Sequence, residues 1–159
     1  MPQASAGILL YRRRGEGLQV LLGHFGGPVW AKKDEGAWAI PKGLIEPGET
    51  AEAAARREFA EEIGTRIDAP LRALGIIRQK GGKTVEVFAC EGDLDADRIV
   101  SNEFSMEWSL RSGRFAFFPE IDRAAWFGLA DARIRMLPSQ LPLLDLLEAA
   151  LEEERGGPA

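Results

Sequence analysis

An acidic segment that follows a loop of glycine and proline constrains this chain more than any other feature. Residues 46–62 carry six acidic and two basic side chains, a net charge of −4 out of −5 for the whole chain. Thr50 can cap the N-terminus of a helix, and Gly64 can end one in the left-handed conformation. The sequence therefore predicts a loop followed by a helix over residues 51–63.

Three carboxylates of this predicted helix share one face. Glu58, Glu61 and Glu62 stand at positions i, i+3 and i+4, where like charges repel by about 0.2–0.5 kcal/mol per pair. A divalent cation would turn that repulsion into affinity, and oxygen-only ligands favour Mg²⁺ or Mn²⁺ over zinc. Arg57 can hold Glu61 by a charge-assisted hydrogen bond. Beside a loop that can bind an anion, these acids predict phosphate-ester or anhydride chemistry. The alternative interpretation is a solvated helix face.

The run from Gly43 to Gly64 also matches a known pattern. It resembles the Nudix box, Gly-x5-Glu-x7-Arg-Glu-U-x-Glu-Glu-x-Gly-U, where U is a bulky hydrophobic residue, and all seven fixed identities are present. Phe59 fills the first U position, whereas Thr65 departs from the last, which is a packing position. The preceding run Trp38–Gly43 resembles the family's lead-in strand. The chain is thus similar to the Nudix hydrolase superfamily (MutT-like).

The resemblance implies a fold, an activity and a set of site residues. The fold is α/β (α+β), a Nudix α/β/α sandwich with a mixed β-sheet between helices. The activity is Mg²⁺- or Mn²⁺-dependent hydrolysis of a nucleoside diphosphate linked to another moiety. The implied metal ligands are Glu58 and Glu62, with Glu61 as a third and Gly43 through its carbonyl oxygen. Arg57 would orient the glutamates, and Glu49 would brace the loop or help to polarise water.

Downstream residues bear on the substrate. Within the superfamily the chain is most similar to asymmetrical diadenosine-tetraphosphate hydrolases. Lys83 resembles the residue that begins a strand in that group. Glu120 precedes Trp126 by six residues, as does a glutamate that is an additional metal-site acid in that group. That group's marker tyrosine is missing, as is the proline that marks ADP-ribose hydrolases. A dinucleoside polyphosphate or a nucleoside triphosphate is the expected substrate. ADP-ribose hydrolysis, RNA 5′-pyrophosphate hydrolysis and a non-catalytic nucleotide-sensing module stay open.

Aromatic and basic residues supply candidate substrate contacts. Seven of the 13 aromatic residues lie within residues 104–127, where they can stack on a base, form core or make a dimer contact. The candidates for substrate binding are Lys42, Lys83, Trp30, Arg111 and Arg114. His24, the only histidine, is expected to be structural.

The remaining sequence predicts the rest of one domain over residues 1–151. Apolar runs predict strands at residues 6–11, 19–22, 37–40, 73–77, 84–89 and 123–127. Residues 98–119 give no clear assignment. Ser139 is expected to cap a terminal helix over residues 140–154, with a flexible tail over residues 152–159.

Composition excludes several classes of protein. The acidic balance disfavours a basic nucleic-acid coat protein, so a small-molecule nucleotide is expected rather than a stable nucleic-acid partner. The lone Cys90 excludes an intrachain disulfide and is expected in the core. No apolar run approaches the roughly 20 residues that span a bilayer. A cytoplasmic protein without membrane association is expected, and a homodimer stays open.

Overall fold

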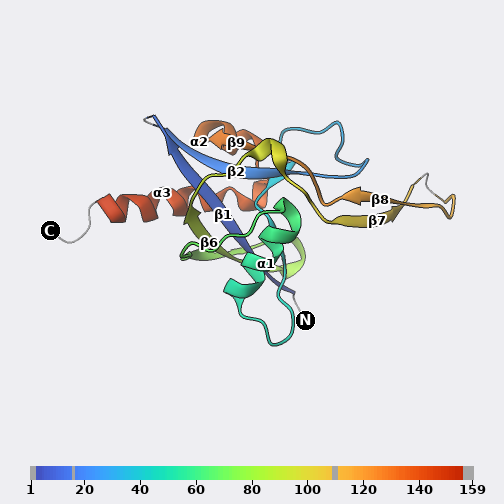
Figure 1. Cartoon of the computed structure of the whole chain (residues 1–159), viewed down its shortest axis with the longest axis horizontal. Helices are drawn as coiled ribbons and strands as arrows, with labels where there is room; N and C mark the ends of the chain where they lie inside the picture. The colour runs from blue at the N-terminus through green and yellow to red at the C-terminus, as the bar shows by residue number, and fades with distance from the viewer. Residues whose placement is uncertain (1–2, 16, 109–110, 156–159) are drawn as a thin grey trace.

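A mixed β-sheet with helices on both faces organises the chain (Figure 1). The structure is a computed structural model that describes residues 3–15, 17–108 and 111–155. The strands are β1 (Ala4–Arg14), β2 (Gly17–Phe25), β3 (Trp38–Ala39), β4 (Lys42–Leu44), β5 (Arg72–Arg78), β6 (Thr84–Glu91), β7 (Glu103–Glu107), β8 (Phe115–Pro119) and β9 (Ile121–Gly128). The helices are α1 (Ala51–Ile63), α2 (Leu129–Arg135) and α3 (Pro142–Arg155), and short 3-10 turns lie at Lys80–Gly82, Ala96–Arg98 and Pro138–Gln140.

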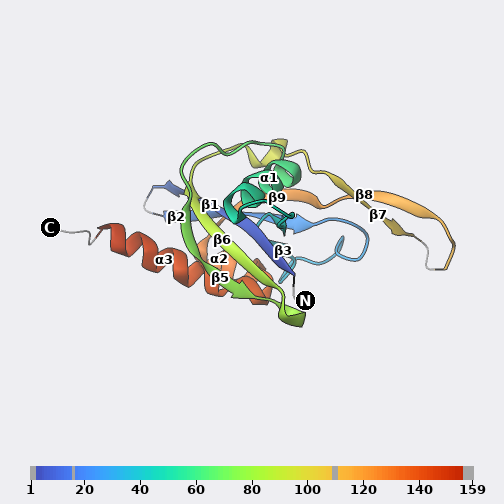
Figure 2. The ribbon, with the colours of Figure 1, turned by 90° about the horizontal axis from the view of Figure 1, so that it is seen from below.

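Strand β1 lies at the centre of the sheet. It pairs antiparallel with β2 and β4 and parallel with β6, which pairs in turn with β5. Strands β3 and β9 pair antiparallel with β2. The predicted mixed sheet is therefore confirmed. Separately, β7 and β8 form a two-stranded antiparallel ribbon that projects from the body in both views (Figure 1, Figure 2).

Side chains of β1 alternate between two hydrophobic cores. Ile8 and Leu10 pack on the side of α1, with Phe59 and the buried Cys90. Leu9 packs on the opposite side, against the buried leucines of α3. Figure 2 shows α1 and α3 on opposite faces of the sheet. A strand buried on both faces reads as a continuous apolar run, which is the pattern seen in β1. The α/β/α sandwich and the core position of the cysteine are confirmed.

Helix α1 begins and ends where the sequence predicts. The Thr50 hydroxyl accepts a hydrogen bond from the Ala53 N–H (3.1 Å). Gly64 takes a left-handed φ of 84°, and its N–H donates to the Ala60 carbonyl oxygen (2.8 Å). Both ends of the helix thus satisfy backbone groups that would otherwise lack partners.

Two segments that the sequence did not resolve are regular structure. Residues 129–135 form α2, which was not predicted as a helix. The unassigned residues 98–119 contain the β7–β8 ribbon.

The start and end of the last helix differ from prediction. Helix α3 begins at Pro142, so the predicted cap at Ser139 is wrong. Gln140 is fully buried, and its side-chain oxygen accepts a hydrogen bond from the Ile40 N–H (2.9 Å), which holds a 3-10 turn ahead of the helix. Helix α3 continues to Arg155, so the first part of the predicted tail is helical, and residues 156–159 lie outside the described residues. Among the described residues, no helix is long and apolar enough to cross a membrane.

His24 is buried and joins β2 to two other segments. Its Nε2 donates to the Lys33 carbonyl oxygen (2.6 Å), and its Nδ1 lies 2.9 Å from a carboxylate oxygen of Asp122. Its ring also meets Trp38 edge-on, with 5.1 Å between centroids. These contacts match the structural role that was expected.

Replacing His24 with Ala should therefore destabilise the fold by about 2–4 kcal/mol, since it removes two hydrogen bonds and opens a cavity. At about 2–4 °C per kcal/mol for a chain of this size, Tm should fall by roughly 5–15 °C. Thermal unfolding followed by circular dichroism measures the change. Lys33→Ala is the matched control, because it keeps the backbone carbonyl. A Tm within about 2 °C of the wild type for His24→Ala would contradict the structural role.

Candidate functional site

Strand β4 and helix α1 bring the predicted glycine and glutamates together. Gly43 lies directly against the Glu58 side chain, because a Cβ at residue 43 would collide with the Glu58 carboxylate. Antiparallel pairing with β1, in which Gly43 faces Ala6, holds β4 in this place. Glycine at residue 43 therefore lets the Glu58 carboxylate keep this position, since a Cβ there would displace it from Arg57.

The Arg57 guanidinium joins the loop to the helix. Its Nε and Nη2 donate to the two carboxylate oxygens of Glu49 (2.9 and 3.0 Å), and its Nη1 donates to Glu58 (2.8 Å). Nη2 also donates to the Leu44 carbonyl oxygen (2.9 Å), and Nη1 lies 3.4 Å from Glu61. The hydrogen bonds from Arg57 lower the pKa of Glu49 to about 2. Arg57 thus fixes the ionised Glu49 and the Glu58 side chain relative to each other.

Glu62 places a carboxylate in a buried setting. Its Oε2 is inaccessible to solvent and has no hydrogen-bond partner. Burial, and then the charge of Glu58, raise the pKa of Glu62 to about 8. Burial also raises the pKa of Glu58 and of Glu120, and it lowers the pKa of Lys42. A buried carboxylate oxygen without a partner is unfavourable unless a cation or proton joins it.

Two adjoining cavities border these acids. The acidic cavity, of about 140 Å³, is lined by Lys42, Glu62 and Glu120 together with Phe25, Ile40, Ile121 and the small residues Gly23 and Ala39. The aromatic cavity, of about 270 Å³, shares Phe25 and Glu120, and its other side-chain walls are Val29, Trp30, Phe104 and Met106. The Trp30 ring lies 4.7 Å from the Phe25 ring. An apolar, aromatic compartment thus opens beside a charged one.

The structure does not bring every predicted site residue to these cavities. Trp30, Lys42 and Glu120 line them. Lys83 is instead exposed, directly before β6. Burial lowers the pKa of Lys42, and the charge of Lys83 adds to that lowering. Arg111 and Arg114 are exposed at the far end of the β7–β8 ribbon and line neither cavity. The aromatic segment also divides: Phe104, Phe115, Phe117 and Phe118 lie in the two strands of the ribbon, whereas Trp126 and Phe127 lie in β9.

A preformed metal cage is absent from the described part of the chain, where no three His, Cys, Asp or Glu side chains converge closely enough to hold an ion. The ion pairs give the reason, since Glu58 and the half-exposed Glu61 both turn toward Arg57. The residues nonetheless fit a hard divalent cation. Their donors are all oxygens, and Oε2 of Glu62 is buried with no partner.

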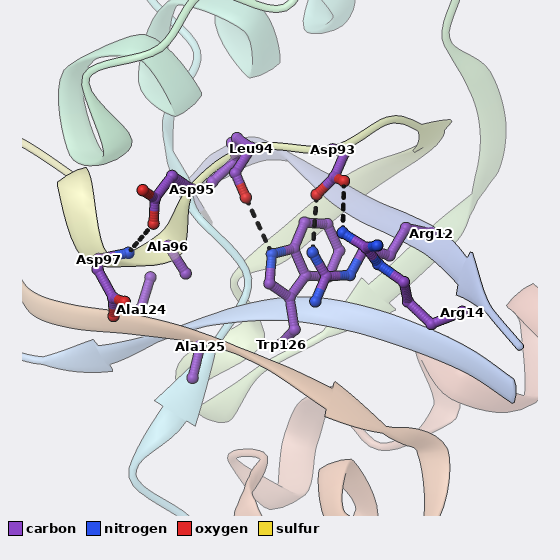
Figure 3. Close-up of a pocket in the computed structure, with 10 residues that line it drawn as sticks. All are labelled: Arg12, Arg14, Asp93, Leu94, Asp95, Ala96, Asp97, Ala124, Ala125 and Trp126. Atoms are coloured by element: carbon purple, nitrogen blue, oxygen red, sulfur yellow. Dashed lines mark hydrogen bonds and ion pairs between the residues drawn. The ribbon is translucent and has the colours of Figure 1, made fainter.

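A more voluminous cavity, of about 720 Å³, is lined by none of the box residues (Figure 3). Arg12 forms part of its wall, and the Arg12 guanidinium lies 4.1 Å from the centre of the Trp126 ring. Both Arg12 and Arg14 form ion pairs with Asp93 (2.7 and 2.9 Å), and Trp126 donates to the Leu94 carbonyl oxygen (3.1 Å). The polar groups of this cavity are thus largely paired with one another, and we assign it to packing between β1, β9 and the segment after β6.

Sequence reasoning missed the aromatic cavity walls Phe25, Phe104 and Met106. A signal was present in two successive glycines. A Cβ on Gly26 would collide with the Pro119 backbone, and one on Gly27 would lie 2.9 Å from the Phe104 ring. Adjacent glycines after a strand mark a close approach of backbone to another segment, here the ribbon.

Comparisons with known proteins agree with this geometry. A model of the NUDIX domain family matches residues 1–147. An RNA pyrophosphohydrolase of Baumannia cicadellinicola subsp. Homalodisca coagulata is 47% identical over 49 residues, which are 30% of this chain and 31% of that protein. A second, from Erythrobacter litoralis (strain HTCC2594), is 43% identical over 63 residues, or 40% and 34% of the two chains. The matched segments span about a third of the length of these curated relatives.

A solved structure extends the likeness to the fold. The crystal structure of a C. elegans Ap4A hydrolase binary complex superposes with a TM-score of 0.68, covering 93% of this chain and 98% of that chain at 22% identity. The sandwich, the box at one end of it and the family match over most of the sequence lead to one conclusion: the chain belongs to the NUDIX domain family.

Proposed function

We propose that the protein is a pyrophosphohydrolase that cleaves a phosphoanhydride linkage in a nucleoside diphosphate joined to another moiety, with Mg²⁺ or Mn²⁺. The buried Glu62 carboxylate carries the proposal, because one of its oxygens has no partner and it borders a cavity together with Glu120. Acids so placed favour a cation, and a cation reverses the local charge so that an anionic phosphate can bind.

The metal would be held by oxygen donors of the box and its surroundings. The ligands we assign are Glu58 and Glu62, then Glu61 and Glu120, and the carbonyl oxygen of Gly43. When bound, the cation neutralises phosphate oxygens and lowers the pKa of the attacking water.

The chain's own residues orient the reactants. Arg57 holds Glu58 in place and keeps Glu49 ionised at the end of the loop. Lys42 provides an ammonium group for a phosphate in the acidic cavity. Glu120 borders the same cavity and would accept the proton of the attacking water when it is not bound to the cation. As the water oxygen bonds to phosphorus, the bridging P–O bond breaks and two phosphate products separate.

The aromatic cavity supports a nucleotide as the substrate. Phe25, Trp30 and Phe104 offer faces and edges on which a base can pack, next to the acids that would hold its phosphates. A dinucleoside polyphosphate or a nucleoside triphosphate is our first candidate. A 5′-pyrophosphate on RNA is the second, favoured by the activity named for the two sequence relatives.

A substrate panel tests the proposal. It contains Ap4A, nucleoside triphosphates, 8-oxo-dGTP, ADP-ribose and RNA with a capped or triphosphorylated 5′ end, each with MgCl₂ or MnCl₂ and with product analysis. We expect metal-dependent release of phosphate or nucleotide from at least one of them. Thermal stabilisation by a nucleotide without any product would instead identify a sensing module.

Metal-free protein should lose stability as the pH rises. The pKa of Glu62 is about 8 in the fold, against an ordinary value of 4.5. Since the fold favours the protonated form of Glu62, protonation of Glu62 stabilises the fold. That stabilisation is complete below pH 4.5 and is lost as the pH passes through about 8. The Tm of the wild type in EDTA should therefore fall by a few degrees relative to Glu62→Gln between about pH 5 and about pH 9. MgCl₂ should remove most of that difference.

Glu52→Gln is the control for this titration, because Glu52 is an exposed acid on the same helix, paired with Arg56 (3.1 Å). Its pH profile should follow that of the wild type. If the difference in Tm between the wild type and Glu62→Gln did not change with pH, Glu62 would not be the buried titrating acid.

A further inference from the structure

One face of the β7–β8 ribbon continues the aromatic cavity. In an antiparallel pair, residues directly opposite share a face, and so do alternate residues along a strand. Phe104 pairs with Phe118, and Met106 pairs with Ala116. Because Phe104 and Met106 line the aromatic cavity beside Glu120, this face begins inside the candidate site.

The same face runs outward to Trp108 and Arg114. The backbone N–H of Trp108 donates to the Arg114 carbonyl oxygen (2.9 Å), which extends the ladder of paired residues by one pair. The Trp108 ring meets Phe118 edge-on at 6.4 Å, and the rings of Phe118 and Phe104 are 6.2 Å apart. Phe104 and Phe118 thus lie side by side across the two strands at the cavity, and the Trp108 ring meets Phe118 from further along the ribbon.

Core packing does not account for the outer end of this face. Trp108 is 53% exposed, and the ribbon stands away from the body (Figure 1). Arg111 and Arg114 are exposed at the same end, and within the described residues neither guanidinium is ion-paired, in contrast to Arg57. Aromatic rings beside available guanidinium groups suit single-stranded nucleic acid, whose bases stack on rings and whose phosphates attract cations.

We propose that this face of the ribbon binds the first nucleotides of a single-stranded polynucleotide whose 5′-pyrophosphate reaches the carboxylates. The inference rests on the proposed function and names its substrate class. From Phe104 to Trp108 the strand advances about 13 Å, at about 3.3 Å per residue. Bases stacked along one strand are about 3.4 Å apart, so the face has room for about four nucleotides.

A second nucleoside joined through a polyphosphate bridge is the competing occupant. It would bring one more base and no phosphodiester, and most of the face would stay uncovered. Arg111 and Arg114 lie at the far end, where the phosphodiesters of a longer chain would pass. The polymer therefore fits the ribbon better.

Kinetics on 5′-triphosphorylated oligoribonucleotides of one to about six nucleotides test the proposal. We expect kcat/KM of the wild type to rise with length and to level off at about four nucleotides. Trp108→Ala should lower kcat/KM on the longest substrate by about 10-fold, and its effect should shrink as the chain shortens. Arg114→Gln should reduce the salt dependence of kcat/KM on the long substrates.

Phe117→Ser is the matched control, because Phe117 is 70% exposed and lies on the opposite face of the same ribbon. It should retain the length dependence of the wild type. Wild-type rates that do not depend on length would overturn the proposal, as would equal losses from Phe117→Ser and Trp108→Ala. A loss on Ap4A that matches the loss on long RNA would assign the face to a second nucleoside instead.

A binding measurement separates this inference from the proposed function. Fluorescence anisotropy with a labelled 5′-hydroxyl oligonucleotide needs no turnover, and Trp108→Ala should raise Kd by about 10-fold. Oligonucleotide binding that depends on Trp108, without hydrolysis of any substrate, would contradict the proposed hydrolase activity and support the ribbon site. Hydrolysis of free nucleotides, with no effect of Trp108→Ala on oligonucleotide binding, would support the hydrolase activity and contradict the ribbon site.

Discussion

Glu62→Gln should lower Mg²⁺-dependent turnover by at least about 100-fold while the protein stays folded. Glutamine has nearly the same shape, so the packing around residue 62 is kept. The substitution removes one of the two carboxylates of the acidic cavity and replaces one oxygen with an amide nitrogen that cannot bind a metal. Because the buried Oε2 of Glu62 has no partner, the metal-free variant should be at least as stable as the wild type at about pH 8. Steady-state kinetics and thermal unfolding measure the two effects.

The control is again Glu52→Gln, which removes one charge from the same helix without touching either cavity. It should keep close to wild-type activity. If Glu62→Gln hydrolysed Ap4A and nucleoside triphosphates at wild-type rates, Glu62 would not be a metal ligand. A variant that fails to fold would contradict this prediction, since loss of a buried, unpaired carboxylate oxygen should leave Tm equal or higher.

Arg57→Ala should lower activity by about 10–100-fold, an effect typical of a residue that positions metal ligands. Arg57 holds Glu49, Glu58 and the Leu44 carbonyl oxygen at once, so its loss releases the loop from the helix and leaves several carboxylates facing one another. We also expect a loss of about 1–3 kcal/mol in the free energy of unfolding. A titration of Mg²⁺ against activity should show weaker apparent metal affinity.

Arg57→Lys separates charge from geometry. A lysine ammonium keeps the positive charge, but it cannot reproduce the planar fork that spans Glu49 and Glu58. We expect it to recover stability more than activity. Full recovery of activity would show that Arg57 acts only through its charge. Arg56→Ala is the neighbouring control, because Arg56 bonds Glu52 and the Ile67 carbonyl oxygen rather than the box acids.

The parts of the fold that the sequence predicts are those set by local chemistry. The bounds of α1 follow from the Thr50 hydroxyl and the left-handed Gly64, which act within one turn of the helix. The face shared by Glu58 and Glu62 follows from helical spacing alone. The inner strands β1, β2 and β6 contain continuous apolar runs because both of their faces are buried over those runs.

The parts that escaped prediction depend on contacts distant in sequence. The aromatic cavity joins the loop after β2 to the ribbon, so neither segment reveals it by itself. Gln140 looks like the start of a helix in sequence, but its hydrogen bond to Ile40 delays that start. The sequence shows two basic residues, Arg111 and Arg114, but it does not show that they lie at the end of a projecting ribbon.

The two sides of the acidic cavity form by contacts of very different range. Gly43, Arg57 and Glu62 lie on elements adjacent in sequence, β4 and α1, so the contacts among them close only short loops. Glu120 reaches them from the start of β9, whose pairing with β2 is marked by His24 and Asp122, which are 98 residues apart. Contacts between such distant residues form slowly, because a long loop must close first. If β9 frayed from β2 while α1 stayed folded, the acidic cavity would lose Glu120, so the proposed activity would fall before helix content does.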